Sequence, residues 1–273
     1  MEIFVNMNIK EICLISIKRR IEKGEINMNR RICAAIILSV LLLGMTVYFV
    51  VRDKSVTTFY DKENSKEIIW NGARDKKLVA LTFDDGPHPR FTPKILDVLK
   101  KYDAKATFFM LGKHVKLYPE VVKRVANEGH EIGNHTFTHI DVKVNSSQKI
   151  YDEFKKTQEI VYEVTGIKPK LFRPPYGFYN SIVKNITSKE GCRIVLWSTN
   201  QDSKDWSCPG VNKIVNTVVK KTENGDIVIL HDYVVGESDT VEALKTILSE
   251  LKKKGFQFVT VSELLENLDK MEK

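Results

Sequence analysis

Short β-rich runs alternate with segments of helical periodicity over the larger, C-terminal part of this 273-residue chain. The β-rich runs occupy residues 78–83, 106–111, 130–135, 169–177, 192–198, 226–230 and 256–261. A helical pattern follows each run, and strict alternation of this kind predicts parallel strands with helices packed against the sheet. We therefore expect an α/β domain of seven βα units. The pattern alone fits an incomplete (β/α) barrel and an open doubly wound sheet equally well.

Residues with reactive side chains recur where the predicted strands end. In both kinds of parallel sheet, ligands bind at the carboxyl ends of the strands. The acids, imidazoles, guanidinium and indole expected at these ends are Asp84, Asp85, His135, His139, Arg173, Asp202, Asp205, Trp206, His231 and Asp232. Polar residues scattered over a surface would not gather at one end in this way. This end of the sheet is therefore predicted to be the functional site.

Two of these groups have the pattern of a catalytic metal site. His135 and His139 are four residues apart, a spacing that places both rings on one side of a helical turn. With a strand-end aspartate they leave coordination positions open for water. Of the adjacent Asp84 and Asp85, one can then bind the metal while the other acts as a base. An acidic turn that caps a helix would explain the two aspartates alone, but not the histidines at the same end.

Five short stretches of the sequence carry a family resemblance. TFDDGP, HTFTH, RPPYG, DSKDW and ILH, in that order, resemble the motifs of the polysaccharide deacetylases, the NodB-homology or carbohydrate esterase 4 family. The similarity covers residues 77–265. It implies a distorted (β/α)7 barrel. It also implies an enzyme, a polysaccharide N-deacetylase that uses a metal to hydrolyse acetyl amides, usually on GlcNAc-type sugars.

The resemblance implies a catalytic role for each of five residues. Asp84 corresponds to the general base, and Arg173 holds it through a charge-assisted pair. His231 corresponds to the acid that protonates the leaving amine, and Asp205 orients it. The backbone N–H of Tyr176 is implied as a donor that helps the metal to stabilise the oxyanion.

The resemblance also implies a metal site and a pocket for the acetyl group. Asp85, His135 and His139 correspond to the ligands of a divalent metal. Zinc suits two histidines and a carboxylate, while cobalt, manganese, nickel and Fe(II) remain open. Trp206 and Ile229 correspond to the lining of the acetyl-methyl pocket, and Ile229 replaces the leucine that is usual in the family.

Three further histidines lie outside these motifs. His130 precedes a predicted strand and is expected to be structural, at the opposite end of the sheet. His88 follows the two aspartates and is a candidate for substrate contact. His114 follows the second strand at the same end and is expected to be exposed to solvent.

Residues 32–51 form an apolar run of twenty residues without a charge. As a helix this run would be ~30 Å long, which matches the core of a bilayer. Arg30 and Arg31 precede it directly, so the positive-inside rule places the C-terminal part outside the cytoplasm. A cleaved signal peptide is the alternative, although no A-x-A-like cleavage site follows the run.

The predicted organisation has four segments. They are a cytoplasmic tail (1–31, with Met28 as an alternative start), a transmembrane signal anchor (32–51), a polar tether (52–76) and a deacetylase domain (77–273). The net charge is +8, but no dense Lys/Arg run is interleaved with aromatic residues, so nucleic acid is not an expected partner. The expected partners are the membrane and a polysaccharide substrate, and we expect a monomer.

The leading hypothesis is a single-pass membrane protein whose extracytoplasmic domain removes N-acetyl groups from peptidoglycan GlcNAc. Deacetylation of MurNAc or of chitin-like oligosaccharides, and esterase activity on O-acetylated polysaccharide, are alternatives with the same chemistry. A catalytically inactive wall-binding protein is the alternative without an enzyme activity. The complete set of reactive residues argues against it.

Overall fold

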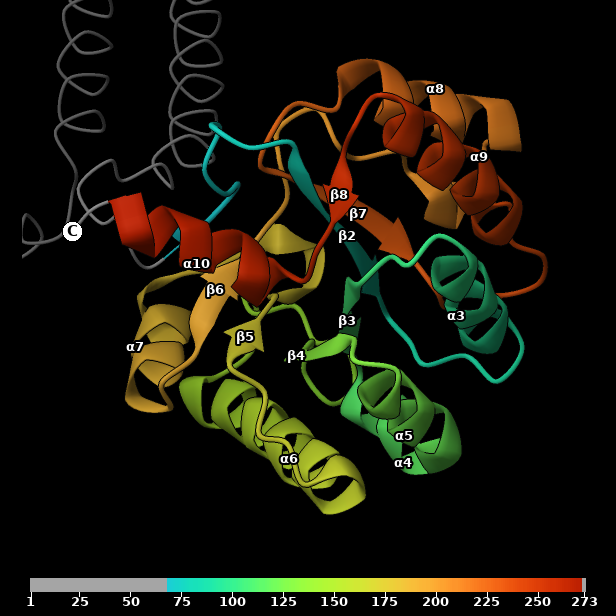
Figure 1. Ribbon diagram of the computed structural model, residues 1–273. Coiled ribbons are helices and arrows are strands. Elements are labelled where there is room, and N and C mark those ends of the chain that lie inside the picture. The colour runs from blue at the N-terminus through green and yellow to red at the C-terminus, as the bar shows by residue number, and fades with distance from the viewer. Residues whose placement is uncertain (1–67, 272–273) are drawn as a thin grey trace, which may run out of the picture. The chain divides into compact units, whose positions relative to one another are not determined.

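The computed structural model describes residues 68–271, which form a curled parallel sheet with helices on its outer side (Figure 1). The strands are β1 (Ile68–Ile69), β2 (Leu78–Asp84), β3 (Ala106–Met110), β4 (Glu131–Asn134), β5 (Leu171–Phe172), β6 (Arg193–Val195), β7 (Asp226–His231) and β8 (Gln257–Phe258). The α-helices are α3 (Phe91–Lys101), α4 (Gly112–Leu117), α5 (Pro119–Asn127), α6 (Ser147–Thr165), α7 (Ser181–Lys189), α8 (Val211–Lys221), α9 (Thr240–Lys253) and α10 (Val261–Met271). The short 3-10 turns η1 (Pro175–Gly177) and η2 (Asp205–Ser207) follow β5 and β6.

The sheet has the strand order β1-β6-β5-β4-β3-β2-β7, and every named strand pair is parallel. β8 pairs with the first residues of β2, where Leu78 and Val79 face Gln257 and Phe258. All seven predicted strands are present, and each is followed by a helix, as the sequence pattern predicted. β2 lies between β3 and β7 and carries Asp84 at its carboxyl end.

The chain that follows β6 pairs with β7, the strand at one edge of the sheet, and so helps to close the curled sheet. The N–H of Ser198 donates to the carbonyl of Ile227, and the N–H of Ile229 donates to that of Gln201. A parallel bridge between Asp202 and Ile229 lies beside these bonds. A sheet curled in this way, with helices outside, is consistent with the distorted (β/α)7 barrel. It does not fit the open doubly wound alternative, whose helices would cover both faces of an open, twisted sheet.

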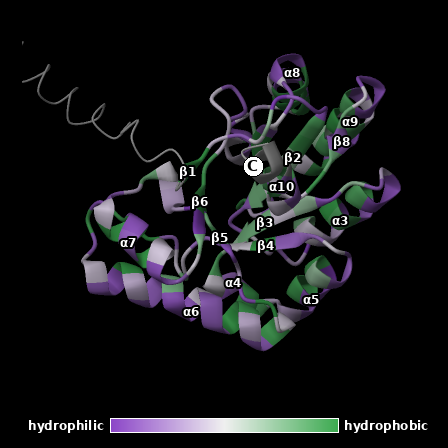
Figure 2. Ribbon diagram, turned by 60° about the vertical axis from the view of Figure 1, so that its left-hand side comes forward, coloured by the Kyte–Doolittle hydropathy of each residue, from purple (hydrophilic) through white to green (hydrophobic). Residues whose placement is uncertain are grey.

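The core lies between the sheet and the surrounding helices. β2 and β3 are buried almost throughout, which is why their sequences are continuous apolar runs rather than alternating ones. Figure 2 shows hydrophobic colour along these central strands, while the helices carry both colours. The helix faces that pack on the sheet include Ile95 and Leu99 of α3 and Leu244 and Leu248 of α9, all fully buried. This packing fixes the strand ends to which the reactive residues are attached.

The predicted start of the domain was wrong by several residues. Residues 68–76 were expected to belong to the polar tether, but Ile68 and Ile69 form β1 and pair with β6. The N–H of Gly72 then donates to the carbonyl of Gly225 at 2.7 Å. Two residues are too few to show a strand period in a sequence. The structure therefore places the beginning of the folded domain at or before Ile68.

The predicted tail, the predicted anchor (32–51) and most of the predicted tether lie outside the described residues. Among residues 68–271, no helix is both long enough and apolar enough to span a bilayer.

Candidate active site

Asp84 ends β2 and is held by a buried arginine. Its Oδ1 accepts a hydrogen bond from Nη1 of Arg173 at 2.7 Å, and both side chains are buried. Arg173, just beyond β5, also donates to Oγ1 of Thr82 at 2.8 Å. Its remaining donors reach the carbonyls of Val195 at 3.2 Å and Leu196 at 2.9 Å. Because these donors have fixed acceptors, the guanidinium holds the Asp84 carboxylate in one orientation.

The chain turns sharply after Asp84, and this separates the two adjacent carboxylates. Asp85 has a φ of 75°, in the left-handed region that few non-glycine residues adopt. The next residue, Gly86, lies against the side chain of Asp232, and a Cβ at this position would overlap the Asp232 carboxylate. Asp85 is thereby directed toward His135 and His139, whereas Asp84 is directed toward Arg173.

Asp85, His135 and His139 form a cluster with the donor set of a metal site. Oδ1 of Asp85 lies 3.5 Å from Nε2 of His135 and 3.4 Å from Nε2 of His139. One ligand atom from each residue lies within 4.8 Å of the others. Among the described residues, the buried Oδ1 of Asp85 has no hydrogen-bond partner. A divalent cation held between these three atoms would give this orphaned oxygen a partner.

The protonation states of the cluster also suit a cation. Nδ1 of His135 lies 2.6 Å from the carbonyl of Arg173, so it carries the proton and leaves the lone pair of Nε2 toward the cluster. Burial lowers the pKa of His135 and of His139 despite the nearby aspartates. Burial also raises the pKa of Asp85. The two lowered pKa values favour neutral imidazoles, so the cluster holds little positive charge of its own, and a bound cation would favour the ionised form of Asp85.

His135 and His139 come together by a different route from the one that we predicted. The segment between them is a bent loop and not a helical turn. Thr136 and His139 have φ values of 67° and 64°, which fold the loop back on itself. The N–H of Thr136 donates to Oδ1 of Asn134, and the N–H of His139 donates to Oγ1 of Thr136. The ring centroids still lie 5.1 Å apart, because the loop is fixed by its own polar side chains.

His231, at the end of β7, is paired with Asp205 of η2. Nδ1 of His231 lies 2.8 Å from Oδ1 of Asp205, whose Oδ2 accepts from the His231 N–H and from Oγ1 of Thr240. Burial lowers the pKa of His231, but the hydrogen bond and charge of Asp205 outweigh it and raise the pKa to about 9. The imidazole therefore stays protonated at neutral pH. This is the state that a general acid requires.

These groups surround a cleft of about 440 Å³. The residues that line it are Asp84, Asp85, His135, His139, Pro174, Tyr176, Gly177, Trp197, Asp202, Trp206, Ile229 and His231. Tyr176 has a φ of 60°, and its N–H donates to no backbone carbonyl within the part of the chain that the structure describes. The ring of Trp206 is exposed and Ile229 is buried, so the cleft has one apolar wall beside the reactive groups.

The structure places the three remaining histidines as follows. His130 is buried, its Nδ1 accepts from the N–H of Ala106, and burial lowers its pKa to about 4, which fits the expected structural role. Nδ1 of His88 accepts from the N–H groups of Arg90 and Phe91 at the start of α3, and His88 does not line the cleft.

The expectation that His114 is exposed was wrong. Its ring is buried and stacks on Tyr233 at 4.0 Å between centroids. Its Nδ1 lies 2.7 Å from the carbonyl of Asp85 and so donates to it. His114 therefore supports the backbone turn that directs Asp85 toward the histidines. No local pattern predicts this contact, because it joins residues 29 positions apart.

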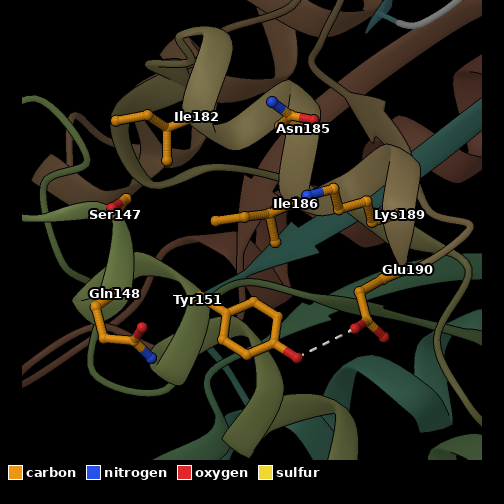
Figure 3. Close-up of a pocket in the computed structure, with 8 residues that line it drawn as sticks. All are labelled: Ser147, Gln148, Tyr151, Ile182, Asn185, Ile186, Lys189 and Glu190. Atoms are coloured by element: carbon orange, nitrogen blue, oxygen red, sulfur yellow. Dashed lines mark hydrogen bonds between the residues drawn. The ribbon is translucent and has the colours of Figure 1, made fainter.

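A second hollow of about 480 Å³ lies between α6 and α7 (Figure 3). Its eight lining residues include Tyr151, Ile186 and Glu190 but neither a histidine nor an aspartate. The hydroxyl of Tyr151 reaches Oε1 of Glu190 at 3.5 Å across it. It lacks the paired acid and base groups of the first cleft, so the first cleft is the candidate active site.

Comparison with known proteins supports this assignment. A family model described as polysaccharide deacetylase matches residues 71–195. A peptidoglycan-N-acetylglucosamine deacetylase of Bacillus cereus is 48% identical over 198 residues, which cover 72% of this chain and 92% of the relative. The chain belongs to the polysaccharide deacetylase family. It is thereby classed as a hydrolase, a polysaccharide N-deacetylase, and the family match includes Asp84, Asp85, His135, His139 and Arg173.

Two solved structures extend the comparison of this deacetylase. A peptidoglycan N-acetylglucosamine deacetylase superposes with a TM-score of 0.71 at 38% identity, covering 73% of this chain and 93% of that chain. A CE4 family pseudoenzyme from Bacillus anthracis superposes with a TM-score of 0.68 at 32% identity, covering 74% and 70%. Because a pseudoenzyme shares the fold, the catalytic side chains rather than the fold must support an assignment of activity.

The His231–Asp205 pair makes a prediction about pH. The pKa of His231 is raised to about 9, so the acid form should persist through neutral pH, and kcat/KM should fall on the alkaline side near pH 9. Asp205→Asn removes the negative charge that raises the pKa of His231, so the alkaline limb of the profile should move to lower pH. A kcat/KM profile of both proteins on an N-acetylated oligosaccharide measures this. Identical alkaline limbs in the two proteins would show that the His231–Asp205 pair does not determine the pKa of the general acid.

The same raised pKa predicts how stability depends on pH. A histidine whose folded pKa exceeds its unfolded value stabilises the folded state fully below about pH 6.5 and loses this contribution as pH rises through about 9. The free energy of unfolding should therefore decline across this window, and the decline should be smaller in Asp205→Asn. Urea unfolding at several pH values is a second readout that does not depend on turnover.

Proposed function

We propose that this chain is a metal-dependent N-deacetylase of cell-wall peptidoglycan and that it acts on GlcNAc residues. The observation that carries the proposal is that two adjacent carboxylates face different partners. Asp84 is fixed by Arg173 beside the cleft, and the orphaned Oδ1 of Asp85 faces two imidazole nitrogens. The similarity to GlcNAc deacetylases of peptidoglycan supports the choice of substrate.

Asp85, His135 and His139 are the residues that would hold the metal. A divalent cation, when bound, supplies a Lewis acid that makes water more acidic and polarises the acetyl carbonyl. Zinc suits this donor set best among the candidate metals.

Asp84 is the proposed general base. Its Oδ1 is occupied by Arg173, and its Oδ2 lies 3.8 Å from Nε2 of His135, on the side of the cluster. Oδ2 accepts a proton from the attacking water while the water oxygen bonds to the acetyl carbon. The N–H of Tyr176, which has no backbone acceptor in the described structure, donates to the developing oxyanion. One such donor is typically worth about 3–4 kcal/mol.

His231 is the proposed general acid. Its Nδ1 is bound to Asp205, so Nε2 is the atom that gives a proton to the departing nitrogen. The carbon–nitrogen bond then breaks, and the products are acetate and a free sugar amine. Asp205 keeps the ring oriented and compensates its positive charge. Trp206 and Ile229 form the wall against which we place the acetyl methyl group.

We also propose that the domain acts outside the cytoplasm, attached through residues 32–51. The supporting observations are the length of the apolar run and the arginines directly before it. A peptidoglycan substrate lies on that side of the membrane.

The proposed function is tested by treating purified peptidoglycan with the full chain and analysing muropeptides by mass spectrometry. Loss of acetyl mass from GlcNAc, with release of acetate, is the expected result, and a metal chelator should stop it. Loss from MurNAc alone would assign the MurNAc alternative. Acetate release without new amines would indicate an O-acetyl esterase. Wall binding without any acetate release would favour the inactive wall-binding protein.

A further inference from the structure

A row of aromatic rings leads out of the cleft from the proposed metal ligand His139. The ring centroid of Tyr176 lies 4.7 Å from that of His139, and the two rings meet edge to face. The ring of Phe178 follows, 6.1 Å from that of Tyr176. Tyr176 and Phe178 are exposed, at 58% and 40% of their surface. Exposed rings in a row beside a sugar-processing site offer apolar faces on which successive sugars can lie.

The row ends in a cation. Nζ of Lys143 lies 3.5 Å from the centroid of the Phe178 ring, a close cation–π contact. Lys143 is exposed, and no carboxylate of the described residues pairs with it. The ammonium group is therefore held by the ring at the rim of the cleft and is free to receive an anion from outside.

The backbone that carries Lys143 is fixed. The N–H of Lys143 donates to Oδ1 of Asp141 at 2.8 Å. The side chain of Asn145 donates to the carbonyl of Asp141. The neighbouring Val142 is buried in the cluster that β5 and α7 also enter. The position of the cation is thus set by the fold as well as by the contact with Phe178.

The charge of the cleft shows why a cation at its rim matters. Asp202 lines the cleft and has no cationic partner among the ion pairs of the described residues, so its carboxylate repels an acidic polymer that approaches. Peptidoglycan is acidic: alternate sugars carry a lactyl group with a carboxylate, or with a peptide that bears carboxylates. An exposed cation at the rim of the cleft would attract such a carboxylate on the sugar next to the reacting one.

We propose that Lys143 and Phe178 form a subsite that binds a carboxylate on the sugar next to the one that is deacetylated. This inference rests on the proposed function and adds a determinant of substrate choice to it. Phe178 presents the ammonium group, and the ammonium group pairs with the carboxylate. The lactyl carboxylate and the peptide carboxylates share this chemistry, so the experiment must separate the two sources.

The test compares three substrates for the full chain and its variants. They are a neutral GlcNAc oligomer, a peptide-free GlcNAc–MurNAc glycan with lactyl carboxylates, and the same glycan with its peptides. The measured quantity is the ratio of kcat/KM on each acidic glycan to kcat/KM on the neutral oligomer. For Lys143→Gln we expect a fall in this ratio of about threefold to fivefold at low salt, which is the upper part of the range for an exposed ion pair. Lys143→Arg should restore the ratio, and high salt should diminish the effect.

Lys156→Gln is the matched control, because Lys156 is an exposed lysine of α6 that does not line the cleft. Its ratios should equal those of the unmodified chain. A fall for only one acidic glycan identifies which carboxylate is bound. Unchanged ratios in Lys143→Gln, or equal falls in Lys143→Gln and Lys156→Gln, would overturn the subsite. A chain inactive on all three substrates would instead overturn the proposed function.

Discussion

Asp84→Asn is expected to retain its metal and to lose turnover by about a hundredfold or more. The amide has nearly the shape of the carboxylate and can still accept from Arg173, but it cannot take a proton from water. General bases typically contribute 10²–10⁴-fold to a rate. The measurements are kcat on an N-acetylated glycan and metal content by elemental analysis. Both are made on the variant and the unmodified chain.

Asp75→Asn provides the control for Asp84→Asn, because Asp75 is exposed and lies before β2. Thermal unfolding of each variant is needed, since Asp84 is the carboxylate partner of the buried Arg173, and weakening a buried pair costs stability. If Asp84→Asn loses the metal while Asp85→Asn keeps it, the two roles are reversed. If Asp84→Asn keeps full turnover, Asp84 is not the base.

His135→Ala is expected to lose metal binding and, with it, nearly all activity. Removal of residues that merely orient metal ligands typically costs 10–100-fold in affinity, so removal of one of three ligands should cost more than about 100-fold. His135 is also the ligand whose tautomer is fixed, by its contact with the carbonyl of Arg173. Competition with a chromogenic chelator measures the affinity directly, without reliance on turnover.

His88→Ala is the histidine control for His135→Ala. His88 contacts the start of α3 and is not part of the cluster, so this variant should keep its metal. Normal zinc affinity in His135→Ala would remove the assignment of the metal site. So would turnover that survives complete removal of metal by a chelator.

The sequence was sufficient for the parts of the fold that depend on local periodicity. β2 and β3 are continuous apolar runs, and the amphipathic segments after them are helices, so the βα alternation could be predicted. The gathering of Asp84, His135 and His231 at one edge followed from the geometry of a parallel sheet, and the structure brings them into one cleft. Their catalytic roles stay predictions.

The parts that could not be predicted depend on contacts between distant residues. The bridge between Asp202 and Ile229, which joins the chain after β6 to β7, has no local signal in either segment. The contact of His114 with Asp85 depends on a ring stacked on Tyr233, far along the chain. A spacing of four residues suggested a helical turn at His135–His139, but left-handed residues produced a loop instead. In each case tertiary contacts outweighed the local pattern.

The left-handed turn at Asp85 has an evolutionary consequence. It gives neighbouring codons separate tasks, because the strand fixes Asp84 while the turn and His114 fix Asp85. With Asp84 as the proposed base, a single substitution at position 84 would abolish the chemistry and leave the residues of the proposed metal site in place. Reversion at the same codon would restore it. If Asp84 has this role, one mutational step separates a chain that deacetylates a glycan from one that only binds it.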